Sequence, residues 1–213
     1  AMELFRAFTA ETPSEEDMEN IRSLKPGAAL LDYLMALSAA ERYFRASGDA
    51  DRALQMNTAT RAAAEPSAAE IAARASLRAA SLLISKLRYA DALVEIERVS
   101  GIRNQSLRDA AAILGAYCTV SSGNYEVKEL DRIINGSAPS EIRYRAMLVK
   151  SRIPRIRLIN NQIEVKKGLE QYRDEILAAL QFARHQRIFR SSADGIFDAI
   201  SERESLEFLV SLY

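Results

Sequence analysis

The stretch "KLRYADALVEIERV", residues 86–99, combines a bend, a small residue and an apolar stripe within one short segment. Leu93, Ile96 and Val99 are three residues apart, so a helix places them on one face. Ala92 precedes them and is small enough to let a second helix approach closely. One helical hairpin cannot bury such a stripe alone, whereas a stack of hairpins can. The stretch therefore predicts helices packed against neighbouring hairpins.

Similar segments recur along the chain, each with a bend followed by a helix whose first leucine can be aligned. They are "GDADRAL" ending at Leu54, "LRYADAL" at Leu93, "GNYEVKEL" at Leu130 and "QIEVKKGL" at Leu169. The aligned leucines are 39, 37 and 39 residues apart. A period of this length is typical of repeat proteins built from stacked helix pairs.

Helical patterning extends over the whole sequence. Apolar residues recur at spacings of three and four, alanine is abundant, and no alternating strand pattern occurs. We predict an all-α fold that forms a single helical-repeat domain over residues 1–213. The expected parts are N-terminal helices within about 2–24, four helix pairs over 28–183 and a C-terminal capping or dimerising helix over 192–213.

The recurring segments resemble the tetratricopeptide repeat in four features: a bend glycine, an aromatic residue just after it, a small residue at the helix crossing and a proline at the end of the unit. The residues that carry them, in that order, are Gly48 and Gly123, Tyr89 and Tyr125, Ala53 and Ala92, and Pro66 and Pro139. The resemblance implies about four antiparallel helix pairs stacked into a right-handed superhelix, a tetratricopeptide-like α-solenoid with capping helices at both ends. The units are longer than the family's ~34 residues, and Lys128 occupies the small position of the third unit. An irregular helical bundle with the same spacing is the alternative.

Composition narrows the class of protein. Lys and Arg together number 29, as do Asp and Glu, so no net charge attracts nucleic acid or an anionic membrane. No uncharged run approaches the ~18 residues that a membrane span needs. Cys118 is the single cysteine and cannot form an internal disulfide. These features predict a cytoplasmic protein without a membrane partner.

The sequence offers little catalytic chemistry. His185 is the only histidine, which excludes sites built from several histidines. No phosphate-binding loop, dinucleotide fingerprint, nucleophile elbow or CxxC pair is present. Cys118 lies among apolar residues and is expected to be a buried small hydrophobe. We expect a protein that is not an enzyme and needs no metal or cofactor.

The segment 142–163 contains six cations and no acid. On a helix, Arg143, Lys150 and Arg157 form one stripe, and a second stripe on the far side is formed by Arg145, Arg152 and Arg155. Nucleic-acid binding through this segment is one interpretation. The opposed stripes, the zero net charge and the absence of a recognition-helix motif count against it. Pairing of one stripe with acids elsewhere in the chain is the other.

The resemblance to tetratricopeptide repeats also implies a binding surface. In that family the first helix of each pair lines a concave groove that holds a peptide or helix. The positions that correspond in this sequence are Arg42, Arg45, Arg74, Ser81, Tyr117, Lys150, Arg157 and Asn160, with Ser38, Leu77 and Ile113 among them. This basic and polar set with apolar insertions suits an acidic segment that bears apolar anchors. It predicts a scaffold, adaptor, chaperone-like or regulatory module that binds another protein.

The C-terminal residues are unusually apolar for a free tail. Those concerned are Ile196, Phe197, Ile200, Leu206, Phe208, Leu209 and Leu212. They are expected to cover the last hairpin or to meet a second copy of the chain as a homodimer. A purely oligomerising structural module is therefore another possible function. If instead the acids of the N-terminal or C-terminal helix pair with the groove cations, these cations are neutralised within the chain and no free site remains for a ligand.

Overall fold

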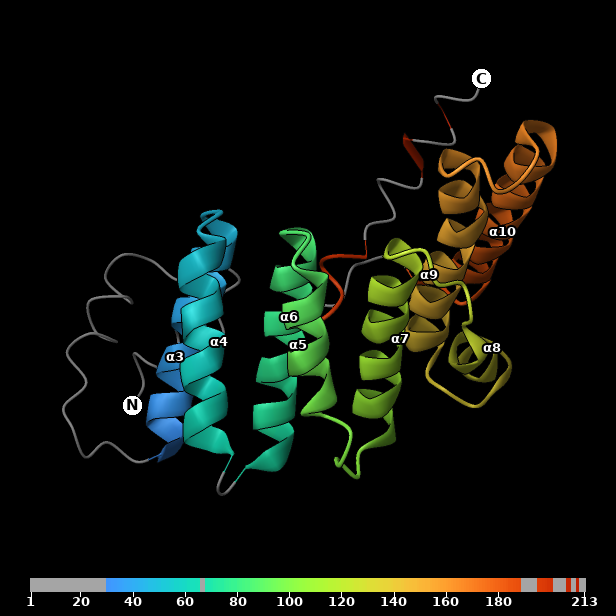
Figure 1. Cartoon of the computed structure of the whole chain (residues 1–213). Helices are drawn as coiled ribbons and strands as arrows, with labels where there is room; N and C mark the ends of the chain where they lie inside the picture. Colours follow the sequence, from blue (N-terminus) through green and yellow to red (C-terminus); the bar gives the residue numbers. More distant parts are fainter. Residues whose placement is uncertain (1–29, 66–67, 189–194, 201–205, 208–209, 211–213) are drawn as a thin grey trace.

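A computed structural model describes residues 30–65, 68–188, 195–200, 206–207 and 210. Within these ranges the regular secondary structure is entirely helical, which confirms the all-α prediction (Figure 1). The helices are α3 Leu30–Ala46, α4 Ala50–Ala64, α5 Ala69–Ser85, α6 Tyr89–Glu97, α7 Gln105–Ser121, α8 Lys128–Asn135, α9 Ser140–Ile159 and α10 Val165–His185. The helices expected within 2–24 and most of residues 201–213 lie outside the described residues.

Successive helices pack as pairs: α3 with α4, α5 with α6, α7 with α8, and α9 with α10. The second helix of each pair also packs on the first helix of the next, giving the contacts α4–α5, α6–α7 and α8–α9. The first helices α5, α7 and α9 contact one another in turn. This pattern of neighbour contacts is compatible with a helical repeat.

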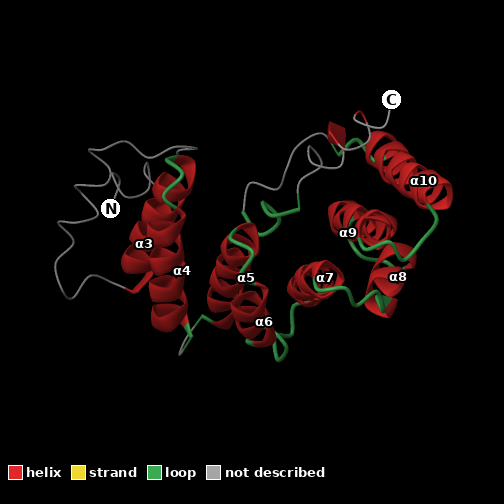
Figure 2. Ribbon diagram, turned by 45° about the horizontal axis from the view of Figure 1, so that its top comes forward, coloured by secondary structure: helices red, strands yellow, loops and turns green. Residues whose placement is uncertain are grey.

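The pairs follow an arc, and residues 195–200 lie on its inner side, next to α5 (Figure 2). These six residues form turns. Residues 195–200 lie within the range expected to hold the C-terminal capping or dimerising helix, 192–213, and are not helical. Short apolar stretches carry helical periodicity too weakly to distinguish a helix from a series of turns.

The first helix of each pair ends in the same kind of turn. A residue with positive φ follows the last helical turn: Gly48, Leu87, Gly123 and Asn161, which are 39, 36 and 38 residues apart. The next backbone N–H donates to the carbonyl five residues earlier, as from Asp49 to Phe44 at 2.8 Å. The equivalent bonds run from Arg88 to Leu83 at 2.9 Å, from Asn124 to Thr119 at 2.9 Å and from Gln162 to Arg157 at 2.8 Å. This arrangement is a Schellman cap, and it recurs with nearly the same spacing as the repeats in the sequence.

The second helix of a pair buries a small residue. Ala53 and Ala92 are fully buried, as expected of small residues that let a neighbouring helix approach. In α10 the tight contact is made by Gly168, where a Cβ atom would lie 3.0 Å from Ile163 Cγ2. The expected stripe of α6 is only partly buried, because Leu93 is 39% exposed. Leu93 is adjacent to Ala92 and therefore lies about 100° around the helix from the crossing.

Candidate functional site

Residues 195–200 contact the first helices of three different pairs. The donors and acceptors come from α3, α5 and α9, although these helices are far apart in the sequence. The three hydrogen bonds are Arg45 Nη1 to Asp198 Oδ2 at 2.9 Å, Ala199 N to Ser81 Oγ at 3.1 Å, and Arg145 Nη1 to the Ile200 carbonyl at 3.2 Å. We call the surface formed by Arg45, Ser81 and Arg145 the inner site.

Apolar side chains anchor the same segment. Ile196, Phe197 and Ile200 are only 2%, 5% and 3% exposed and belong to the main hydrophobic core. The Phe197 ring centroid lies 5.9 Å from the guanidinium carbon of Arg145, within the range of a cation–π contact. The segment is therefore held by three buried anchors in addition to its polar contacts.

Gly195 fits closely against Arg45. Its φ of +72° lies in the left-handed region that L-residues with a side chain rarely adopt. A Cβ atom at this position would lie 1.5 Å from Arg45 Nη1. Arg45 is itself fixed by Asp198 and by Glu41, whose Oε1 is 3.7 Å from Arg45 Nε. The backbone conformation thus favours glycine here, whereas the tip of the Arg45 side chain could move aside for a Cβ atom.

Charges of both signs surround Arg45. Burial is the main cause that lowers the pKa of Arg42, and the nearby charges of Arg78 and Arg45 lower it further, while Glu41 opposes them. The three guanidinium groups repel one another, and the carboxylate of Glu41 offsets part of this repulsion. Asp198 adds a second carboxylate at Arg45.

Arg145 and Arg152 are seven residues apart on one face of α9, and we call them the inner stripe. Arg145 is buried and also lies 3.8 Å from the Glu141 carboxylate. The guanidinium carbon of Arg152 lies 4.3 Å from the centroid of the Tyr117 ring, on α7. Tyr117, a predicted site residue, is consequently buried beneath an arginine.

The structure directs the other stripe of α9 away from the inner site. Arg143, Lys150 and Arg157, the α8-facing stripe, contact α8, α10 and the α7–α8 connection. Arg143 donates to the Ile134 carbonyl at 2.8 Å, Lys150 Nζ lies 2.8 Å from Asp131 Oδ1, and the Arg157 guanidinium carbon lies 4.8 Å from the Tyr125 ring centroid. The hydrogen bond with Asp131 is the main cause that raises the pKa of Lys150.

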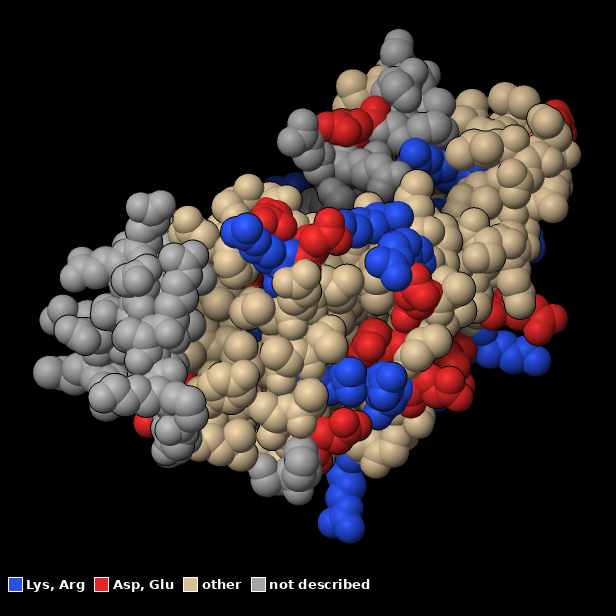
Figure 3. Space-filling view, turned by 60° about the vertical axis from the view of Figure 1, so that its left-hand side comes forward, with Lys and Arg blue, Asp and Glu red and all other residues tan. Residues whose placement is uncertain are grey.

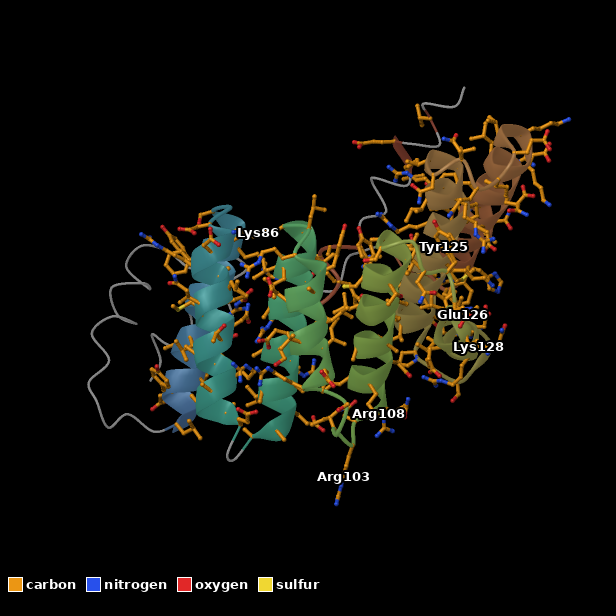
Figure 4. The ribbon with its side chains drawn as sticks, viewed as in Figure 1. Lys86, Arg103, Arg108, Tyr125, Glu126 and Lys128 are labelled. Atoms are coloured by element: carbon orange, nitrogen blue, oxygen red, sulfur yellow. The ribbon has the colours of Figure 1, made fainter. Side chains whose placement is uncertain are left out.

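Of the predicted site residues, Lys150, Arg157 and Asn160 are thus not grouped with Arg45 and Ser81. Asn160 Nδ2 donates to the Tyr125 hydroxyl at 3.2 Å, and Tyr125 lies in the connection beside α9 (Figure 4). Arg74 is exposed on α5, two turns before Ser81. Sequence reasoning missed Arg145 and Asp198 as partners of the inner site. The only signal for Arg145 in the sequence is its place in the second basic stripe. The only signal for Asp198 is that an acid occurs within an apolar stretch.

The α8-facing stripe borders a hollow with a volume of about 460 Å³ between α9 and α10. Lys150 and Arg157 line it together with Asp174 and Glu175, so positive and negative charges are balanced there. Figure 3 shows basic and acidic side chains interspersed over the face it presents. A hollow of mixed charge gives no particular advantage to an acidic ligand or to a phosphate backbone.

In the part of the chain that the structure describes, no group of three or more His, Cys, Asp or Glu side chains is arranged to bind a metal ion. Among the helices of the same residues, none combines the length and apolar character that crossing a membrane requires. Comparison with known proteins gives no relatives: no protein-family profile, no curated protein and no solved structure matches the sequence.

Proposed function

We propose that this chain is a non-enzymatic protein-interaction module of the tetratricopeptide-like kind, with its helix pairs in a right-handed superhelix. The inner site binds a short acidic segment of a partner protein that carries apolar anchors. The observation that supports this most directly is the seating of residues 195–200 there, because it displays the ligand chemistry that the surface accepts. A scaffold, adaptor or chaperone-like role follows from such binding.

The contacts are of the kind used to recognise peptides. Ser81 and Arg145 bond to backbone groups of the segment, which any sequence can supply, while Arg45 selects a carboxylate. Each buried apolar anchor is worth about 1.5–3 kcal/mol and a partly exposed ion pair about 0.2–1 kcal/mol. The three anchors and the ion pair together supply about 5–10 kcal/mol before the cost of association, so we expect micromolar affinity at best, for which the binding free energy is about −8 kcal/mol.

The experiment uses an opened variant, the full chain with Phe197→Ala and Asp198→Ala, so that its own segment no longer fits the inner site. Fluorescence anisotropy measures the binding of a labelled peptide with the sequence of residues 193–202. We expect micromolar binding that is lost when Arg45→Glu is added and kept when Lys150→Glu is added. An opened variant with a native far-ultraviolet circular dichroism spectrum that binds no peptide would refute the function.

A further inference from the structure

We propose that residues 195–200 are an internal ligand that closes the inner site, and that the partner segment displaces them by presenting the same chemistry. This inference rests on the proposed function. The partner segment would carry, in order, a glycine, two apolar residues, an acid, a small residue and a third apolar residue, the pattern of residues 195–200. The protein would then be inactive in binding until this competition occurs.

The way the segment is held resembles a bound peptide more than a packed helix. A capping helix satisfies most of its backbone groups internally. Here the Ala199 N–H and the Ile200 carbonyl are instead satisfied by side chains of α5 and α9. Within the segment, the Ile200 N–H donates to the Phe197 carbonyl at 2.8 Å, which is the bond of a turn. Another peptide with the same turn could make every one of these contacts.

Each position of the segment has a recognisable requirement. Gly195 is favoured by its φ of +72°. Asp198 is matched to Arg45 at 2.9 Å, and Phe197 is matched to the guanidinium of Arg145. A surface that specifies backbone angle, charge and ring position in one short stretch can discriminate between peptides.

Tethering makes the internal ligand a strong competitor. A segment joined to the chain by a short linker has an effective concentration in the millimolar range. If the segment binds the inner site with an intrinsic dissociation constant in the micromolar range, the closed form weakens the apparent affinity for a free partner by a factor of up to about 10³. Partners with the full pattern, or present at high local concentration, would still open it. Segments that lack the acid would be excluded.

The test compares wild-type chain with the opened variant, both full length, using the peptide of residues 193–202 as the probe. We expect the opened variant to bind the peptide about tenfold more tightly or better than wild type does. A peptide carrying Asp198→Arg should bind neither protein. It should bind an opened variant that also carries Arg45→Asp, because the charges are then exchanged. Lys150→Glu is the matched control. It should leave the ratio of the two dissociation constants, wild type to opened variant, unchanged.

A second measurement detects displacement directly. Hydrogen exchange at the amides of Ala199 and Ile200 in wild-type protein should accelerate when the peptide is added, while exchange in α5 and α7 stays slow. Equal peptide affinity of wild type and opened variant would overturn the inference and leave the binding function standing. Absence of binding to the opened variant would overturn both. Accelerated exchange throughout α3–α9 in the opened variant would show that the segment is a structural part of the core, which also overturns the inference.

Discussion

The two basic stripes of α9 lie on one helix and have different surroundings. In the inner stripe, Arg145 bonds to residues 195–200 and Arg152 stacks on Tyr117 of α7. In the α8-facing stripe, Lys150 pairs with Asp131 and Arg157 stacks on Tyr125. Both stripes therefore have an aromatic ring and an oxygen acceptor as partners. They differ in where those partners come from.

The partners of Lys150 and Arg157 in the α8-facing stripe belong to α8 and the connection before it. The acceptor of Arg145 lies 55 residues away, in a segment of turns. Asp131 is held by the fold of the third pair, so its contact with Lys150 forms whenever the two pairs stack. A basic stripe recognised in a sequence hence becomes a candidate ligand site only once the origin of its partners is known.

The two tyrosines give the largest difference between the stripes. Tyr117→Ala should lower the free energy of unfolding by about 3–5 kcal/mol, because a buried ring is removed and a cavity is left beneath Arg152. Tyr125→Ala should cost about 1–2 kcal/mol, since Tyr125 is only half-buried and loses one stacking contact and its hydrogen bonds. Urea unfolding measures both. Equal losses would contradict the distinction between the stripes.

The cations give the next difference. Arg145→Met should cost about 1–3 kcal/mol, because the buried Ile200 carbonyl loses its donor. Lys150→Met should cost less than about 1 kcal/mol, since its pair with Asp131 is partly exposed and screened by solvent. Thermal unfolding of the two variants at equal ionic strength checks this order. A larger loss for Lys150→Met would mean that the α8-facing pair stabilises the stack more than the inner contact does.

The pH dependence of the Lys150 pair is a smaller effect. The pKa of Lys150 is raised by its hydrogen bond to Asp131, so the folded chain holds this proton more tightly than the unfolded chain. The stabilisation is fully present below the unfolded pKa of about 10.4 and is lost as pH rises through the folded pKa. The difference in unfolding free energy between wild type and Lys150→Met should accordingly be constant near neutrality and shrink in alkali. A difference that grows in alkali would mean that folding lowers the pKa of Lys150 instead of raising it.

Cys118 reports on α7 without changing stability. Burial raises the pKa of its thiol to about 11, so it stays protonated and inaccessible at about pH 8. Iodoacetamide should leave Cys118 unmodified in wild type and in the opened variant, and modify it in urea. Mass spectrometry of the intact chain measures this. Modification of the opened variant under native conditions would show that α7 separates from its neighbours when the segment leaves.

The sequence predicts the helices better than the site, for physical reasons that particular residues show. Gly48 and Gly123 mark their turns because glycine adopts positive φ freely. Leu87 and Asn161 occupy the same conformation with no such signal. The spacing of the leucines aligned the fourth unit at Leu169, but it did not show that Lys150 and Arg157 contact α8 and the connection before it. Helical propensity and residue spacing are local properties, so they determine which residues share a face of a helix. They do not determine which other part of the chain packs against that face.

The segment at 195–200 was recognised as too apolar for a free tail, but its location could not be inferred. The pair formed by Arg45 and Asp198 joins positions 153 residues apart, and the bond from Ala199 to Ser81 spans 118. No local pattern encodes contacts at such separations. They follow from the curvature that the stacked pairs adopt together, which depends on every crossing in the series.

These long-range bonds also bear on how the chain folds. Contacts between adjacent hairpins have low contact order, and a linear array of them can fray from either end one unit at a time. The bonds from residues 195–200 to α3, α5 and α9 connect the beginning of the array to its end. Closing such a loop has an entropic cost that grows only with the logarithm of its length. Seating of the segment therefore converts a series of semi-independent units into one cooperative transition, and its release restores stepwise unfolding from the ends.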